Sequence, residues 1–254
     1  MKVIIKAVLM CAAALPFWSQ TALSQAEQAK PGPVEAFFCK FQPGKGMADL
    51  MPVAQRFAKW ADQNDSSYSA WILTPAFGQF TELPQVIWLG ANPTGNDMGK
   101  GQDTWRKSGG DLQKAFDSVI ACGAHSVASS VPINVPDGNP GDGVVMFTQC
   151  SVDDDGDYMK VVAAHKQYSK AMRALGAKNS NWLFFPMIGA SAEMDFDYWG
   201  VSTFPSWSDF FAAYEIYVNG GGWQKGMELL DDVAECDSGS PSVWDVKLVR
   251  QGAS

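Results

Sequence analysis

Apolar positions along the chain change their period several times, and each change predicts an element. Apolar and aromatic residues dominate 34–41, which predicts a strand. Four apolar residues then recur at the three- to four-residue spacing of a helix over about 47–63: Leu50, Ala54, Phe57 and Ala61. The same criteria place three strands at 69–76, 84–89 and 127–135 and a second helix at 111–121. The predicted order is β-α-β-β-α-β.

This order begins again after a segment rich in Pro, Gly, Asn and Asp at 136–143, which we interpret as a linker. The second set of strands is predicted at 144–152, 182–187, 194–199 and 242–249, with helices at 158–175 and 223–235. Two long connections lie in corresponding places, at 90–110 and 200–222, and the second contains a predicted helix at 206–218. Connections of this length often act as binding lids.

The two sets also match residue by residue, which indicates an internal duplication. The sequence Trp-x-x-x-Pro-x-x-Gly begins at Trp71 and again at Trp182, a shift of 111 residues. The same shift relates further residues of the two sets: Cys39 and Cys150, Phe57 and Tyr168, Lys59 and Lys170, Glu82 and Glu193, Trp88 and Trp199. We therefore predict two repeats, at 34–135 and 144–254.

A β-α-β-β-α-β unit is the ferredoxin-like plan, in which the helices cover one face of the sheet. Two such units can bury their open faces against each other. In this duplication the sequence resembles the dimeric α/β barrel superfamily, in the form where two fused halves replace the dimer. The resemblance implies an α+β fold with two tandem ferredoxin-like repeats packed as one pseudo-twofold barrel, monomeric in solution. Two separate ferredoxin-like domains without a shared interior are the alternative. The fold does not select an activity.

Residues 1–24 have the pattern of a secretory signal peptide. Lys2 and Lys6 form a basic start, an apolar run covers 7–18, and the small-x-small sequence at 22–24 is typical of a cleavage site. The run is shorter than the roughly 20 apolar residues that span a membrane. We expect cleavage before Gln25, a flexible leader over 25–33, and export to the periplasm or the extracellular space.

Charge limits the partners of the exported protein. The full chain has a net charge of −8, and removing 1–24, which hold two lysines and no acidic residue, leaves −10. Nucleic acids and anionic membranes both require a basic surface. We therefore expect neither as a partner, and no later segment is long and apolar enough to span a membrane.

Four cysteines follow the signal peptide, as expected of an exported disulfide-bonded protein: Cys39, Cys122, Cys150 and Cys236. Three pairings are possible. Cys39–Cys122 and Cys150–Cys236 is the pairing that treats the two repeats alike. Each bridge would close a long loop and stabilise the fold by about 4 kcal/mol in the chain-entropy model. A metal site is not predicted, because the close Cys or Cys/His spacing of such sites is lacking.

Candidate catalytic residues lie mainly in the second repeat. The predicted strand at 194–199 and the residue before it place Glu193, Asp195 and Asp197 on one side, where paired carboxylates could act as acid and base. A solvated strand edge is the alternative. His165 lies on the apolar side of the predicted helix at 158–175, pointing away from a barrel cavity; a structural role competes with a catalytic one. His125 has the sequence context of a loop residue.

Aromatic residues suggest a ligand site, because cavities lined by aromatic side chains suit small organic molecules. The candidate ligand-binding residues are Trp71, Trp88, Trp182, Trp199, Trp207 and Tyr214. The leading hypothesis is a small, largely apolar ligand in the barrel cavity, walled by the shared tryptophans and capped by the two long connections. An enzyme using the carboxylates of the second repeat and a non-catalytic protein interaction module are the alternatives. The sequence identifies no cofactor.

Overall fold

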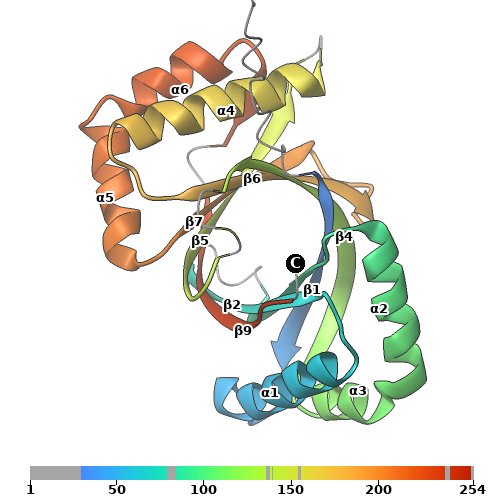
Figure 1. Ribbon diagram of the computed structural model, residues 1–254. Coiled ribbons are helices and arrows are strands. Elements are labelled where there is room, and N and C mark those ends of the chain that lie inside the picture. Colours follow the sequence, from blue (N-terminus) through green and yellow to red (C-terminus); the bar gives the residue numbers. More distant parts are fainter. Residues whose placement is uncertain are drawn as a thin grey trace, which may run out of the picture.

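A closed antiparallel barrel of eight strands forms the centre of the molecule, with helices on two opposite sides (Figure 1). The computed structural model describes residues 30–252, apart from 79–83, 136, 137, 139, 154, 155 and 238–240. The predicted signal peptide at 1–24, residues 25–29 of the predicted leader, and part of the linker at 136–143 lie outside the described residues.

The first half of the chain supplies four barrel strands and three helices. Its elements are β1 (Gly32–Phe41), α1 (Met47–Gln63), β2 (Ser69–Phe77), β3 (Val86–Ala91), α2 (Gly95–Ser108), α3 (Gly110–Asp117) and β4 (Ile120–Asn134). The second half repeats this order with its last strand divided in two. Its elements are β5 (Gly143–Val152), α4 (Tyr158–Ala174), β6 (Ser180–Ile188), β7 (Tyr198–Phe204), α5 (Trp207–Val218), α6 (Gly222–Leu230), β8 (Ala234–Cys236) and β9 (Ser242–Arg250).

Two seams join the halves into one barrel. Strand β4 pairs with β6, and β2 pairs with β9, while β5 pairs with β7 to complete the circle. One apolar cluster, with Trp71, Val145, Val201 and Trp244 among its buried members, takes side chains from both halves. The halves therefore share an interior, and the alternative of two separate domains is wrong.

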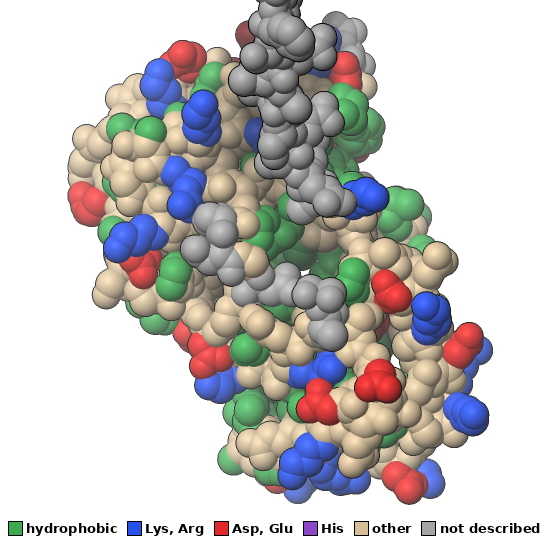
Figure 2. All heavy atoms as spheres, viewed as in Figure 1, with side chains coloured by type: hydrophobic (Ala, Val, Ile, Leu, Met, Phe, Trp, Pro, Cys, Tyr) green, Lys and Arg blue, Asp and Glu red, His purple; other side chains and the backbone are tan. Residues whose placement is uncertain are grey.

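Helices α1–α3 cover one side of the barrel and α4–α6 the other (Figure 1). Each group packs on the outer face of its strands. In the first half, Leu50, Phe57 and Trp88 belong to one such cluster. Basic and acidic side chains occur beside one another on the visible surface of both groups (Figure 2). Among the described residues no helix is both long and apolar enough for a membrane span.

Several predicted boundaries are corrected. Strand β7 begins at Tyr198, whereas we expected a strand from residue 194; β4 begins at Ile120, inside the region 111–121 predicted as helix. The connection 90–110 contains α2, which the hydrophobic pattern did not predict, since this helix has no fully buried residue. Its start is fixed by Thr94, whose Oγ1 accepts a hydrogen bond from the Asp97 N–H at 3.1 Å.

The predicted equivalence of Trp88 and Trp199 is wrong by one residue. Cys39 on β1 pairs with Val86, and Cys150 on β5 pairs with Tyr198, so β3 and β7 are related by a shift of 112 rather than 111. One residue reverses the side of a strand on which a side chain lies. Trp88 therefore faces the helices, and Trp199 faces the barrel interior.

Both predicted disulfides are present. Cys39 is bonded to Cys122, and Cys150 to Cys236. Each joins the first strand of its half to the strand that pairs beside it, β4 in the first case and β8 in the second. Two disulfides indicate an oxidising, non-cytoplasmic environment.

Candidate functional site

A pocket of about 590 Å³ lies outside the barrel, between the first group of helices and the outer face of β1, β3 and β4. We call it the outer pocket. The strands form its floor, α1 contributes Phe57 and Trp60, α2 contributes Gln102 and Trp105, and α3 contributes Phe116. Through α2, the long connection 90–110 thus covers the outer pocket. We expected this connection to cap a cavity inside the barrel, which it does not.

Three aromatic side chains form a row across the floor. Phe37 on β1 pairs with Trp88 on β3 and with His125 on β4, so all three project toward the helices. The rings of Phe37 and His125 are stacked, with centroids 3.7 Å apart and an interplanar angle of 12°. His125 is therefore a strand residue of the pocket floor, and our description of it as a loop residue is wrong.

Glu35 is the buried polar group of this floor. It lies two residues before Phe37 and so on the same face of β1, and its side chain is only 4% exposed. Its Oε2 is 2.9 Å from His125 Nε2 and accepts a hydrogen bond from Gln102 Nε2 at 3.3 Å. A buried carboxylate requires such donors, because removing it from water is costly.

Tyr68 completes the polar group next to Glu35. Gly90 lies opposite Glu35 on β3, and a Cβ atom there would come within 1.6 Å of the Tyr68 hydroxyl, so a side chain at this position would displace the tyrosine. The hydroxyl accepts a hydrogen bond from Trp88 Nε1 at 3.1 Å. Burial, together with the charge of Glu35 and a hydrogen bond to it, raises the pKa of Tyr68 well above its usual value. Tyr68 is therefore a neutral hydrogen-bond donor.

Aromatic rings meet edge to face around the pocket. Phe57 contacts Trp88 with ring centroids 5.0 Å apart, Trp88 contacts Phe116 at 5.1 Å, and Trp60 contacts Trp105 at 5.1 Å. This is the preferred geometry of aromatic pairs, and each pair contributes roughly 1 kcal/mol beyond its buried area. The aromatic wall is thus a packed structure on which a ligand could rest.

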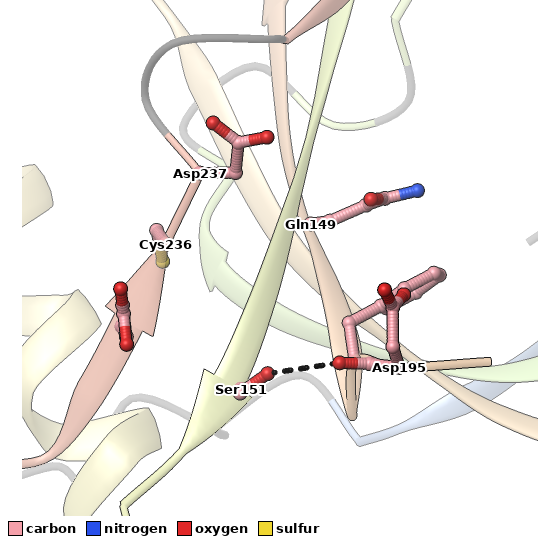
Figure 3. Close-up of a pocket in the computed structure, with 7 residues that line it drawn as sticks. Gln149, Ser151, Asp195, Cys236 and Asp237 are labelled. Atoms are coloured by element: carbon pink, nitrogen blue, oxygen red, sulfur yellow. Dashed lines mark hydrogen bonds between the residues drawn. The ribbon is translucent and has the colours of Figure 1, made fainter.

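The predicted carboxylates lie elsewhere, in the segment before β7, and one of them, Asp195, lines a smaller pocket of about 420 Å³ (Figure 3). Glu193, Asp195 and Asp197 precede β7 in a loop and are exposed, so the predicted strand alternation does not apply to them. Asp195 lines this pocket, and its backbone oxygen accepts a hydrogen bond from Ser151 Oγ at 3.5 Å. Asp197 Oδ2 instead accepts the Val152 N–H at 2.8 Å, which fixes the loop to β5. These contacts organise the loop and leave the carboxylates largely solvated.

His165 lies on α4 and faces the sheet, away from the barrel interior, as expected. Its Nε2 is 2.8 Å from the Tyr198 hydroxyl. Burial lowers the pKa of His165 from 6.5 to about 4, so the imidazole is neutral at physiological pH. Helix α4, which carries it, lies on the other side of the barrel from α1–α3, the helices that line the outer pocket (Figure 1).

The candidate ligand-binding aromatics are divided among three places. Trp71, Trp182 and Trp199 belong to the cluster inside the barrel, and Trp88 lines the outer pocket. Trp207 lies on α5, where its Nε1 donates to Asp245 Oδ1 at 2.9 Å. Tyr214 lies on the same helix and is 53% exposed. The structure therefore does not bring the six residues together.

Sequence reasoning missed Glu35, Tyr68 and Gln102 as site residues. A signal was available for Glu35, because it is the one charged residue between Val34 and Phe38 in a strand of apolar side chains. An acid in such a strand requires buried partners. No comparable signal marks Gln102, since the helix that carries it was not predicted.

Metal binding has no visible basis in the described part of the chain. No group of three or more His, Cys, Asp and Glu side chains there is arranged to hold a metal ion.

Comparison with known proteins shows the fold. A candidate monooxygenase from Lactobacillus acidophilus is similar with a TM-score of 0.55 and 10% identity, over 88% of this chain and 97% of that one. An anthrone oxidase-like protein is similar with a TM-score of 0.51 and 10% identity, over 90% of this chain and 97% of that one. A candidate chlorite dismutase is similar with a TM-score of 0.50 and 12% identity, over 88% of this chain and 97% of that one. No protein-family model matches the sequence, and no curated protein matches it.

These likenesses confirm the dimeric α/β barrel that the sequence resemblance implied. At 10–12% identity they show the fold alone and select no family and no reaction.

Proposed function

We propose that this protein binds a small organic molecule with an aromatic or otherwise apolar body, and that the ligand lies in the outer pocket. The observation that carries the proposal is the buried Glu35 at the floor of an aromatic pocket of about 590 Å³. Ligand sites combine mainly apolar walls with a few polar groups that fix orientation, and volumes of about 300–1,000 Å³ are typical. Glu35, Tyr68 and His125 would be those polar groups.

Divergence between the halves supports this location. We interpret each half as a ferredoxin-like repeat, and the disulfide-bonded Cys39 and Cys150 as equivalent positions. The residues equivalent to Glu35 and Phe37 are then Met146 and Thr148, and Gly200 is equivalent to Trp88. Met146 packs against the apolar cluster under α4 and α5. One half thus keeps a polar aromatic pocket where the other has core packing, as expected if a single site evolved after the duplication.

Two earlier hypotheses remain as competing proposals. A ligand inside the barrel would contact Trp71, Trp182 and Trp199. An enzyme using Glu193, Asp195, Asp197 or His165 would act at the other side of the molecule. The protein would in each case work outside the cytoplasm, as an exported monomer that binds neither nucleic acid nor membrane.

Two glycines on α2 allow a direct test. Gly101 lines the outer pocket and Gly99 does not, and a Cβ atom at either would meet nothing within 4 Å. Replacing Gly by Leu in a helix favours the helix by roughly 0.5–1 kcal/mol at either position. Gly101→Leu therefore fills the pocket while Gly99→Leu serves as the matched control.

The measurement is ligand-observed NMR with a panel of single-ring and indole-type compounds against the protein from residue 25 onward. We expect binding that is abolished by Gly101→Leu and retained by Gly99→Leu and by Trp182→Phe. Loss of binding in Trp182→Phe alone would place the ligand inside the barrel, and binding insensitive to Gly101→Leu would refute the proposal.

A further inference from the structure

We infer that the outer pocket selects organic cations, such as aromatic or alkyl ammonium compounds, over neutral and anionic molecules of the same shape. The inference rests on the proposed function and names the chemical class of its ligand. Three features carry it: the charges of the pocket wall, the burial of Glu35, and the aromatic faces above it.

The pocket wall has a negative charge. Its described lining residues include the carboxylates Glu35 and Asp117 and no Lys or Arg, with His125 as the remaining titratable group besides the neutral Tyr68. The wall therefore has a net charge of −2 with a neutral His125 and −1 with a protonated one. Lys100 and Lys114, on the covering helices, have side chains that are 80% and 82% exposed and do not line the pocket.

Among the described residues no Lys or Arg is paired with Glu35, and His125 is its one potential cationic partner. Of its hydrogen-bonding neighbours, Gln102 and Tyr68 are neutral. His125 can become charged, but its side chain is 42% exposed, so that water screens its charge more than that of Glu35. A cation that enters the pocket supplies the missing compensation, whereas an anion would add a second buried negative charge.

Aromatic faces provide the second attraction. Phe37, Phe57, Trp60, Trp88 and Trp105 all line the pocket, and tryptophan is the ring that attracts cations most strongly. An ammonium group within about 6 Å of several ring centroids gains from each. Sets of aromatic rings are what proteins use to bind quaternary ammonium groups, and the carboxylate of Glu35 adds a charge–charge attraction.

The test uses three probes of one shape and different charge: phenyltrimethylammonium, its neutral isostere tert-butylbenzene, and the anion benzenesulfonate. Binding to the protein from residue 25 onward is measured by saturation-transfer NMR titration. We expect the cation to bind about tenfold or more tightly than the neutral isostere, since cation–π and charge-assisted contacts add to apolar burial. Benzenesulfonate should not bind measurably.

Glu35→Gln tests the source of the selectivity. Glutamine keeps the shape and an acceptor for His125 but removes the charge, so cation affinity should fall about tenfold while that of the neutral isostere stays unchanged. Asp232→Asn is the matched control, because Asp232 is an exposed carboxylate between α6 and β8 that lines neither pocket, and it should leave both affinities unchanged. The comparison of probes on the unsubstituted protein does not depend on whether Glu35→Gln folds.

Equal binding of cation and neutral isostere, both blocked by Gly101→Leu, would overturn this inference and leave the proposed function standing. Equal losses for both probes in Glu35→Gln would also overturn it. If Gly101→Leu blocks the binding of none of the three probes, the result counts against both.

Discussion

His165 ties the stability of the fold to pH. Its imidazole is held neutral between α4 and the sheet, with a folded-state pKa lowered from 6.5 to about 4 by burial. Well above pH 6.5 the imidazole is neutral in both the folded and the unfolded state, so the free energy of unfolding does not change with pH through this group. Between pH 6.5 and 4 the imidazole is protonated in the unfolded chain but remains neutral in the folded chain. The free energy of unfolding therefore falls as the pH falls.

We predict that this loss is on the order of 3 kcal/mol in total, from about 1.4 kcal/mol per pK unit. His165→Gln cannot titrate and should lose less stability over the same range. Urea unfolding from pH 7.5 to 4.5 measures both proteins. The free energy of unfolding of the variant should be lower by a constant amount at every pH, because the hydrogen bond to Tyr198 changes. Curves that stay parallel throughout would contradict the prediction.

At the scale of elements, the two disulfides hold strands of different kinds. Cys122 lies near the start of β4, a strand that also pairs with β1 and β6 over most of its length. Cys236 ends β8, a strand of three residues whose one partner among the described strands is β5. The bridges span similar separations, 83 and 86 residues, so the chain-entropy model gives each about 4 kcal/mol.

We therefore predict similar stability losses but different local effects when each pair is replaced by alanine. Cys150→Ala with Cys236→Ala should release β8 while β9 stays paired with β2 and β5. Cys39→Ala with Cys122→Ala should loosen the first residues of β4, next to the pocket floor at His125. Urea unfolding and amide hydrogen exchange measure the two effects. Lower global stability speeds the exchange of the slowest amides in both variants alike, so the local effect is the additional increase at β8 or at the start of β4. Equal increases at both places in the two variants would argue against this local role.

The same scale explains what the sequence could predict. The predicted shift of 111 residues correctly related the positions of β1 and β5, of α1 and α4, and of β2 and β6, because the spacing of these elements is the same in both halves. One added residue before β7 broke the shift, which reversed the side on which Trp199 lies relative to Trp88. The outer pocket depends on which side of each strand a side chain lies and on the presence of α2. Hydrophobic periodicity could not reveal this helix, because it has no fully buried residue.

At the scale of the whole molecule, the barrel depends on contacts between two halves that are not connected by either of the two disulfides in the described part of the chain. Cys39–Cys122 lies within the first half and Cys150–Cys236 within the second. The seams β4–β6 and β2–β9 and the shared interior around Trp71 and Trp244 hold the halves together. At one seam Arg250 also donates from Nε to Asp62 Oδ1 at 2.7 Å.

We predict that a chain cut in the linker, by a protease site placed at 136–139, remains a 1:1 complex of its two fragments. Separation would leave an apolar sheet face of each half in water, and burial of that face favours association by about 25 cal/mol per Å². Size-exclusion chromatography before and after cleavage, with and without urea, measures it. Because the disulfides do not cross the cut, co-elution without urea reports the non-covalent barrel directly. Fragments that separate without urea would show that the linker, rather than the seams, keeps the barrel closed.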